Sequence, residues 1–293
     1  MTQGQATIEP MKALASWPQQ DRRQLIGVFT DIDDTLTTDG AITPDALQAL
    51  TRLKAAGLHV IPITGRPIGW CEPFANGDPA HGIAPWPVDA IVAENGAVAF
   101  AFANLCQISL QPPWNKGMQL SKLYQESDAT RASHFTRLQQ VATQVLHDVP
   151  GTSLSQDSPG RETDIAIDHS EFAHLPPDQI ARVVAIMRAA GMNASVSSIH
   201  INGWFGSHNK LEGARWIVRE LFGRDLDAER DQWVYVGDST NDQLMFQHFR
   251  HSVGVANILR FASELTHQPR YITRSERGAG FAEVARAILD ARG

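Results

Sequence analysis

The apolar residues of this 293-residue chain follow two patterns. Short runs of consecutive apolar residues predict strands that are buried on both faces, as in a parallel sheet. Longer segments with apolar residues three or four positions apart predict helices that bury one face. The runs that predict strands are residues 25–29, 58–63, 89–93, 97–102, 233–236, 252–255 and 271–273.

Helices are predicted between several of these strands. Thr43 and Pro44 are typical of a helix start, and Gly57 ends the apolar stripe that follows them. A second stripe runs from Lys210 to Gly223, and a last one ends the chain. Strands that alternate with helices in this way are typical of α/β proteins with a parallel sheet.

The middle of the chain follows a different pattern. The segment 163–167 alternates like a half-exposed strand, and residues 194–197 and 199–202 predict a pair of strands beside helices. We therefore predict an α/β protein with a three-layer, Rossmann-like parallel sheet as its core and an inserted α+β domain. The predicted parts are an N-terminal extension at 1–22, the core at 23–103 and 206–293, and the insertion at 104–205.

The composition narrows the class of protein. Hydrophobic residues make up 43% of the chain and charged residues 19%, which is enough to bury a sizeable core. The net charge is −7 and there is no block rich in Lys and Arg, so neither nucleic acid nor a membrane is an expected partner. Cys71 and Cys106 are too few for a disulfide framework. Without a signal-peptide pattern we expect a cytoplasmic monomer or homodimer.

Carboxylates gather just after the first predicted strand, at Asp31, Asp33 and Asp34. Active sites of open α/β sheets lie at the carboxyl ends of strands. Carboxylates this close repel one another unless a proton or a cation relieves the charge, and Mg²⁺ prefers oxygen ligands. Asp31 could then act as a nucleophile in phosphoryl transfer, with Asp33 as an acid or base. The alternative is that these residues only form an Asx turn and cap a helix.

Polar residues also follow other predicted strands. They offer a hydroxyl group, two cations and a second group of carboxylates, which together with Asp31 are what phosphoryl transfer requires. Each cluster alone has a simpler interpretation as a loop with solvated side chains. The residues are Thr64, Gly65 and Arg66 after the second strand, Lys210 at a helix start, and Asp238, Asn241 and Asp242 after the strand 233–236.

The order and spacing of these residues resemble the haloacid dehalogenase (HAD) superfamily across the whole predicted core. Its four motifs correspond to DIDDTL at 31–36, Thr64 in ITGRP, Lys210, and GDSTND at 237–242. The segments 94–97 and 254–257 and the place of the insertion are similar to the IIB branch. That branch includes phosphatases of sucrose phosphate and of mannosyl-3-phosphoglycerate.

The resemblance implies a catalytic role for several carboxylates. Asp31 becomes phosphorylated, while Asp33 protonates the leaving alkoxide and later activates water. Mg²⁺ is held by the carboxylates of Asp31 and Asp238 and by the backbone carbonyl of Asp33. Asp242 and Asn241 support this metal site.

Substrate binding is implied for residues of the second, third and fourth motifs. Thr64 and Lys210 hold the transferring phosphoryl oxygens. Gly65 and Arg66 in the same loop, together with Asn241, are expected to contact the substrate.

The insertion resembles the cap of this family, which closes over the site and contacts the leaving group, so substrate choice should lie there. In one of its predicted strands, His200, Asn202 and Trp204 share a face and would suit a sugar. The alternative is that Trp204 packs in the core while His200 is solvated. Arg161 and Asp164 border the other strand, where charged residues are usually solvated.

The preferred hypothesis is a magnesium-dependent phosphatase that hydrolyses a small phosphorylated metabolite through an aspartyl-phosphate. The substrate would be a sugar phosphate or a glycosyl phosphate. A phosphosugar mutase similar to phosphomannomutase is the nearest alternative, because it shares the motifs but returns the phosphoryl group to the sugar. A regulatory protein switched by phosphorylation of Asp31 is less favoured, because Asp33 should promote turnover. The fold alone decides none of this.

Overall fold

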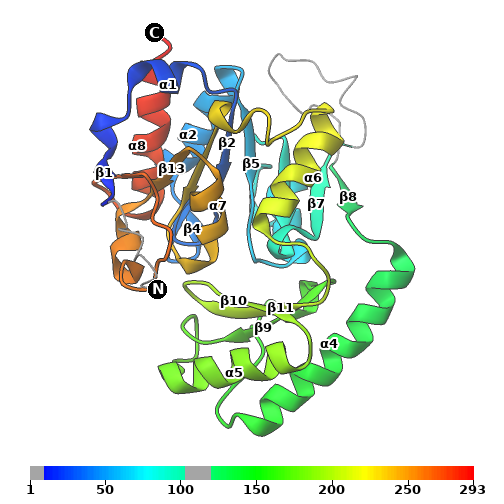
Figure 1. Cartoon of the computed structure of the whole chain (residues 1–293). Coiled ribbons are helices and arrows are strands. Elements are labelled where there is room, and N and C mark those ends of the chain that lie inside the picture. Colours follow the sequence, from blue (N-terminus) through cyan, green and yellow to red (C-terminus); the bar gives the residue numbers. More distant parts are fainter. Residues whose placement is uncertain (1–9, 103–119) are drawn as a thin grey trace. The chain divides into compact units, whose positions relative to one another are not determined.

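The computed structural model describes residues 10–102 and 120–293. The chain divides into two compact units, and Figure 1 shows the elements of both. Unit 1 comprises residues 1–59 and 229–293, and unit 2 comprises residues 60–228. Cys71 is buried, whereas Cys106 and the predicted boundary at residue 103 lie outside the described residues.

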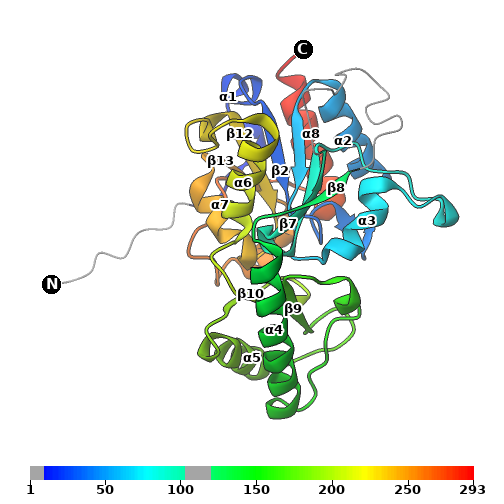
Figure 2. The same cartoon turned by 90° about the vertical axis from the view of Figure 1, so that its right-hand side faces the viewer.

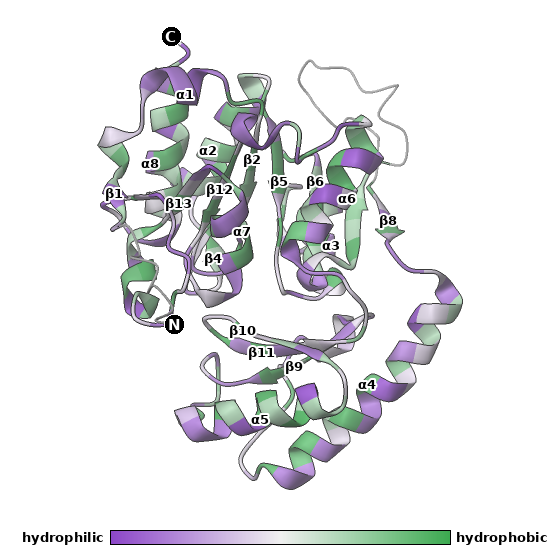
Figure 3. Ribbon diagram, viewed as in Figure 1, coloured by the Kyte–Doolittle hydropathy of each residue, from purple (hydrophilic) through white to green (hydrophobic). Residues whose placement is uncertain are grey.

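A six-stranded sheet has the order β1-β14-β13-β12-β2-β5. Its first five strands belong to unit 1, and β5 begins at His59, where the first segment of unit 1 ends. The pairs β1–β14, β14–β13, β13–β12 and β12–β2 are parallel. β2 is buried along its whole length, and Figure 3 shows β2 and β5 as hydrophobic strands, as the continuous apolar runs predict. The strands are β1 (Lys12–Ala13), β2 (Gly27–Thr30), β5 (His59–Pro62), β12 (Trp233–Gly237), β13 (His251–Gly254) and β14 (Tyr271–Ile272).

Helices of unit 1 cover both faces of this sheet (Figure 1). α2 and α8 pack against each other on one face and α7 lies on the other, so the sheet is the middle of three layers. Thr43 caps α2 by accepting a hydrogen bond from Ala46 N. The predicted α/β class with a Rossmann-like parallel sheet is confirmed. The helices are α1 (Gln19–Arg23), α2 (Pro44–Ala55), α7 (Gln243–His248) and α8 (Arg277–Asp290), with short 3₁₀ helices η1 (Leu14–Ser16), η6 (Arg230–Gln232), η7 (Thr240–Asp242) and η8 (Ala256–Phe261).

Part of the predicted N-terminal extension belongs to unit 1. β1 forms an edge of the sheet, and the Trp17 side chain is fully buried. Its ring stacks on Tyr271 with the centroids 5.4 Å apart and lies 5.6 Å from the His251 ring. This aromatic contact fastens residues 12–17 to β14, the strand next to β1.

In unit 2 the structure describes an antiparallel sheet with the order β6-β7-β8. The hairpin between β6 and β7 turns through η3, where Asn95 and Gly96 have positive φ angles of 55° and 109°. These two residues therefore form a tight turn between the strands. The sequence pattern does not indicate β8, which pairs with β7. The strands are β6 (Ala90–Ala93), β7 (Val98–Ala101) and β8 (Ser121–Tyr124), and η3 is Glu94–Gly96.

A second antiparallel sheet in unit 2 has the order β10-β11-β9. α4 and α5 lie against this sheet (Figure 2), and Leu138, Ile167 and Met187 are among the apolar residues of their shared core. β9 is buried throughout, so its prediction as a half-exposed strand is wrong. Its other face is covered because Arg161 and backbone amides bond Asp164 and Asp168. The elements are β9 (Asp164–Asp168), β10 (Asn193–Val196), β11 (His200–Trp204), α4 (Asp128–Asp148), α5 (Pro177–Ala189) and η5 (Ser158–Gly160).

The remaining helices of unit 2 are α3 (Ile68–Asn76), η2 (Pro79–His81) and α6 (Lys210–Phe222). α6 begins at Lys210 as predicted, because Asn209 Oδ1 accepts hydrogen bonds from the N–H groups of Leu211 and Glu212. Gly223 ends it in the left-handed conformation. None of the helices in the described ranges is long and apolar enough to cross a membrane.

Candidate active site

Asp31 and Asp238 follow the ends of the adjacent parallel strands β2 and β12. The backbone N–H of Asp31 still donates to the Val236 carbonyl at 2.9 Å, which fixes the register. From β2 the chain continues to β5 on one side, and from β12 it continues to β13 on the other. Ligands of open α/β sheets bind where the strand order reverses in this way.

Carboxylate oxygens of Asp31, Asp238 and Asp242 lie within 4.8 Å of one another. All three residues are buried, with exposed fractions of 4%, 1% and 0%. Negative charges this close repel one another, and three hard oxygen donors form a set that suits Mg²⁺. We name these three residues the acidic triad. The structure therefore brings together the three carboxylates of Asp31, Asp238 and Asp242 that were predicted at the metal site.

Asp242 is held in the acidic triad by several donors. Its carboxylate accepts hydrogen bonds from the N–H groups of Asp238 and Ser239 at 2.9 and 3.2 Å, and from the Tyr235 hydroxyl. Burial, followed by the charge of Asp242, raises the pKa of Tyr235 well above its ordinary value, so Tyr235 remains a donor. Tyr235 lies inside an apolar strand run, so the sequence alone suggested only a core residue.

Asn257 connects the two segments that carry the acidic triad. Its amide nitrogen donates to Asp238 Oδ2 at 3.1 Å and to the Asp34 carbonyl at 3.0 Å, and its oxygen accepts from Arg277 N at 2.9 Å. The residue is 2% exposed. These bonds hold the loop after β2 beside the loop after β12.

The loop after Asp31 forms a tight turn. The Ile32 carbonyl accepts hydrogen bonds from the N–H groups of the residues at 35–37. Asp34 has a positive φ angle of 54°, and its carboxylate pairs with Arg277 Nε at 3.0 Å. Asp33 is half-buried and its carboxylate is outside the acidic triad. Asn241 is half-buried and accepts a hydrogen bond from the Ser239 hydroxyl.

In unit 2, Thr64 lies directly beyond the β5 end and is fully buried. Its N–H donates to the Val92 carbonyl and its own carbonyl accepts from Asn95 N, both at 2.9 Å. Its hydroxyl oxygen accepts a hydrogen bond from Arg66 N at 3.0 Å. The hydroxyl proton is thereby free to be donated elsewhere, as a phosphoryl-binding group requires.

Lys210 lies at the start of α6, which packs closely on η3. A Cβ atom at Gly96 would collide with the Asn209 carbonyl oxygen, and the positive φ of Gly96 also favours glycine. The Lys210 residue is 3% exposed. The turn at η3 therefore anchors both the Thr64 loop and the Lys210 helix start within unit 2.

Glu94, the first residue of η3, is a buried junction that the sequence analysis did not assign. Its carboxylate accepts hydrogen bonds from Ile68 N at 3.0 Å, from Glu162 N at 3.1 Å, and from the N–H and hydroxyl groups of Thr163. It therefore connects the start of α3 to the segment that enters β9. No single-residue pattern in the sequence signals such a junction.

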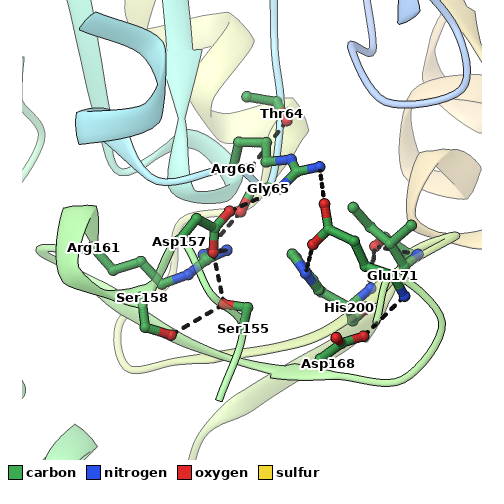
Figure 4. Close-up of polar contacts among 12 residues, drawn as sticks. Thr64, Gly65, Arg66, Ser155, Asp157, Ser158, Arg161, Asp168, Glu171 and His200 are labelled. Carbon is green, nitrogen blue, oxygen red and sulfur yellow. Dashed lines mark hydrogen bonds and ion pairs between the residues drawn. The ribbon is translucent and has the colours of Figure 1, made fainter. Parts of the chain in front are cut away.

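Arg66 lies between carboxylates of the α+β segment (Figure 4). Its Nη1 is 3.0 Å from Asp157 Oδ2, and its Nη2 is 2.8 Å from Glu171 Oε1. The other oxygen of Glu171 is 2.7 Å from His200 Nε2. Arg66 is 6% exposed, so the interpretation as a solvated loop residue is wrong.

Arg161 and Asp164 form a second pair beside Arg66. Arg161 Nη1 donates to the Asp164 carboxylate at 2.7 Å and to the Gly65 carbonyl at 2.9 Å, and Nη2 donates to Asp157 at 3.3 Å. Both residues are buried, so the expectation that they are solvated is wrong. Burial raises the pKa of Asp164 to about 7, although the charge of Arg161 opposes this shift. We name Arg66, Asp157, Arg161, Asp164 and Glu171, with His200 and Asn202, the Arg66 network.

The residues predicted on one face of β11 have different surroundings. Asn202 donates to the Gly65 carbonyl at 3.2 Å and to Asp164 at 3.0 Å. His200 is 2% exposed, which rules out its interpretation as a solvated residue. Trp204 is buried, and its Nε1 donates to the His208 carbonyl at 2.8 Å. Thus His200 and Asn202 join the Arg66 network, whereas Trp204 packs against the segment before α6.

The predicted residues divide between the two units. Unit 1 holds Asp31, Asp33, Asp238, Asn241 and Asp242, and unit 2 holds the rest. Sequence reasoning missed the partners that orient them. The residues assigned no role are Tyr235, Arg277, Asp157 and Glu171, and Glu94 and Asn257 were noted only within family-like segments.

Comparisons with known proteins agree with this fold. Residues 28–126 match the family model of haloacid dehalogenase-like hydrolases. No protein with a curated description matches the chain significantly in sequence. The predicted resemblance to the HAD superfamily is confirmed.

Several solved structures share the fold at low sequence identity. A Thermoplasma acidophilum protein, 0175, is 16% identical with a TM-score of 0.62, over 90% of this chain and 98% of its own. The sucrose-phosphatase of Synechocystis sp. PCC6803, in complex with sucrose and phosphate, is 15% identical with a TM-score of 0.60, over 91% and 98%. A sugar phosphatase of HAD subclass IIB is 15% identical with a TM-score of 0.56, over 90% and 98%.

Proposed function

We propose that this chain is a magnesium-dependent phosphatase that hydrolyses a phosphate monoester of a small metabolite, a sugar phosphate or a glycosyl phosphate. The observation that carries the proposal is the acidic triad at the strand reversal of a HAD-type core. The sugar substrates in the names of two similar structures support the substrate class. In this proposal residues 104–205 act as the cap over a core of residues 23–103 and 206–293.

The proposed reaction has two steps. An Asp31 oxygen attacks phosphorus, the bond from phosphorus to the leaving oxygen breaks, and Asp33 gives its proton to the departing alkoxide. Asp33 then takes a proton from water, whose oxygen attacks the phosphoryl group and releases phosphate from Asp31. Thr64 and Lys210 bind the phosphoryl oxygens during both steps.

The acidic triad fits a divalent cation because its donors are all carboxylate oxygens. Bound there with the Asp33 carbonyl as a further ligand, Mg²⁺ would neutralise charge and orient the phosphoryl group. Tyr235 and Asn257 keep Asp242 and Asp238 in place through their hydrogen bonds.

The first test is phosphate release from sugar phosphates, glycosyl phosphoglycerates, nucleotides and 4-nitrophenyl phosphate, with Mg²⁺ and with chelator. We expect release that requires Mg²⁺ and that Asp31→Asn lowers by on the order of 10³-fold or more. A matched control is Asp231→Asn, which changes an exposed carboxylate paired with Arg250 just before β12.

Two results would reject the assignment. Release that survives Asp31→Asn would exclude Asp31 as the nucleophile. Conversion of a hexose phosphate to its isomer without free phosphate would indicate the mutase instead. Mass spectrometry of the protein after brief incubation with substrate should find the phosphoryl group on Asp31.

A further inference from the structure

Arg66 lies next to the proposed phosphoryl site of unit 2. It follows Thr64 by two residues, and its N–H donates to the Thr64 hydroxyl oxygen at 3.0 Å. If Thr64 binds a phosphoryl oxygen as proposed, Arg66 in the same loop is near the leaving group of the substrate. A free guanidinium at this position would favour a leaving group with a carboxylate or a second phosphate.

The charge of Arg66 is instead offset by the protein. Asp157 and Glu171 bind its two Nη atoms at 3.0 and 2.8 Å, as Figure 4 shows. Burial raises the pKa of Asp157, but the charge of Arg161 and a hydrogen bond from Ser155 outweigh it and lower the pKa to about 2. Burial likewise opposes the lowered pKa of Glu171, which results from bonds with His200 and Arg66. Both groups are therefore anionic at neutral pH.

The carboxylate and guanidinium groups of the Arg66 network together carry no net positive charge. Its three carboxylates, Asp157, Asp164 and Glu171, accompany two guanidinium groups. Its other members, His200 and Asn202, offer an imidazole and an amide. Groups of this kind hydrogen-bond to hydroxyl groups, whereas an added anion would meet the carboxylates at short range.

We propose that Asp157 and Glu171 are specificity residues that make this site select an uncharged, polyhydroxylated leaving group and reject an anionic one. The proposal rests on the phosphatase function proposed above and deepens it. Sugar phosphates with neutral sugars fit this site, and glycosyl phosphoglycerates, whose leaving group bears a carboxylate, do not. Removing either carboxylate leaves the charge of Arg66 less compensated, so the variant should accept anionic leaving groups more readily.

The test compares two pairs of esters that differ mainly by one carboxylate. They are glucose 1-phosphate with glucuronic acid 1-phosphate, and 4-(hydroxymethyl)phenyl phosphate with 4-carboxyphenyl phosphate. We expect kcat/KM of the full-length protein to favour the neutral ester of a pair by about tenfold or more. Glu171→Gln and Asp157→Asn should each lower this ratio by about tenfold, mainly through a lower KM for the anionic ester.

The ratio of kcat/KM for the neutral ester to that for the anionic ester distinguishes a change in specificity from a loss of folded enzyme. Such a loss lowers the rates with both esters equally. The matched control is Glu162→Gln, which removes a carboxylate paired with Lys122 at 2.8 Å outside the Arg66 network and should leave the ratio unchanged. A wild-type ratio near one, or a ratio that neither variant changes, would overturn the specificity proposal alone. No release from any of the four esters or from 4-nitrophenyl phosphate by folded protein would overturn the proposed function itself.

Discussion

In unit 1 the carboxylates of Asp31, Asp238 and Asp242 converge within 4.8 Å, whereas each carboxylate of the Arg66 network in unit 2 lies against a cationic or imidazole side chain. Tyr235 and Asn257, which orient the acidic triad, are neutral hydrogen-bond donors. In the Arg66 network, each carboxylate lies within hydrogen-bonding or ion-pairing distance of a guanidinium or imidazole group.

This difference suggests a division of tasks. A group of like charges stores repulsion that a bound cation or a proton relieves, which suits a site that must take up a metal ion. In a network whose charges are paired, the partners fix the positions of the side chains. Such a network disfavours a ligand that would add an unpaired charge. We therefore expect Mg²⁺ to stabilise the acidic triad, and mutations of the Arg66 network to destabilise the protein with or without metal.

The largest effect is expected for Arg161→Met in unit 2. The substitution leaves the buried Asp164 and the half-buried Asp157 without this guanidinium, and the loss of such a buried partner costs about 3–5 kcal/mol of unfolding free energy. Urea unfolding followed by circular dichroism measures it. Arg215→Met is the matched control, because Arg215 is 30% exposed and pairs with exposed Asp227, so its loss should cost less than about 1 kcal/mol. Equal costs for both variants would contradict the importance of the buried network.

A somewhat smaller effect is expected from His208, a buried group of unit 2 whose ring nitrogens have no hydrogen-bond partner among the described residues. Burial, followed by the charge of His134, lowers the pKa of His208 to about 4. A lowered pKa means that the fold prefers the neutral ring. The neutral His208 ring therefore makes its full contribution to the unfolding free energy above about pH 6.5. This contribution, roughly 3 kcal/mol, is lost as the pH falls to about 4.

His208→Phe tests this contribution, because the ring still stacks near Trp204 but does not titrate. Unfolding free energies at pH 7 and pH 4 should differ by roughly 3 kcal/mol less in the variant than in the wild type. His147→Phe is the control, since the His147 side chain is 86% exposed. An identical pH dependence in wild type and His208→Phe would show that His208 titrates normally.

The smallest effect is expected for Asp31→Asn in unit 1, which removes one of the three carboxylates of the acidic triad. Addition of Mg²⁺ should stabilise the wild type by about 1 kcal/mol but not the variant, which thermal unfolding can detect without any substrate. Equal stabilisation of both proteins by Mg²⁺ would show that Asp31 does not bind the metal ion.

The sequence predicted the fold well where the pattern is local. Continuous apolar runs located β2, β5 and β12, and the cap residue Thr43 located the start of α2. The strand β8 was missed, because Ser121–Tyr124 has exposed residues and little apolar pattern. β9 was found but expected to be half-exposed, because its buried aspartates resemble solvent-facing residues until their partners are known.

The candidate site was predictable to the extent that it follows strand ends. Asp31 and Asp238 could be found because parallel strands bring their carboxyl ends to one edge of a sheet. Their supporting residues could not, because Asn257 and Arg277 lie more than 200 positions after the Asp34 that they bond. No periodicity connects residues so distant in the chain.

By itself, then, the sequence determined which side chains are candidates for chemistry, since residue types and their place after a strand or before a helix are local properties. Only the tertiary structure decided what surrounds them. Arg66 is the clearest case: in the sequence it is a cation beside a strand end, and in the structure it is paired with Asp157 and Glu171, 91 and 105 positions away. Charge compensation depends on distance in space, and that distance is set by the packing of whole elements.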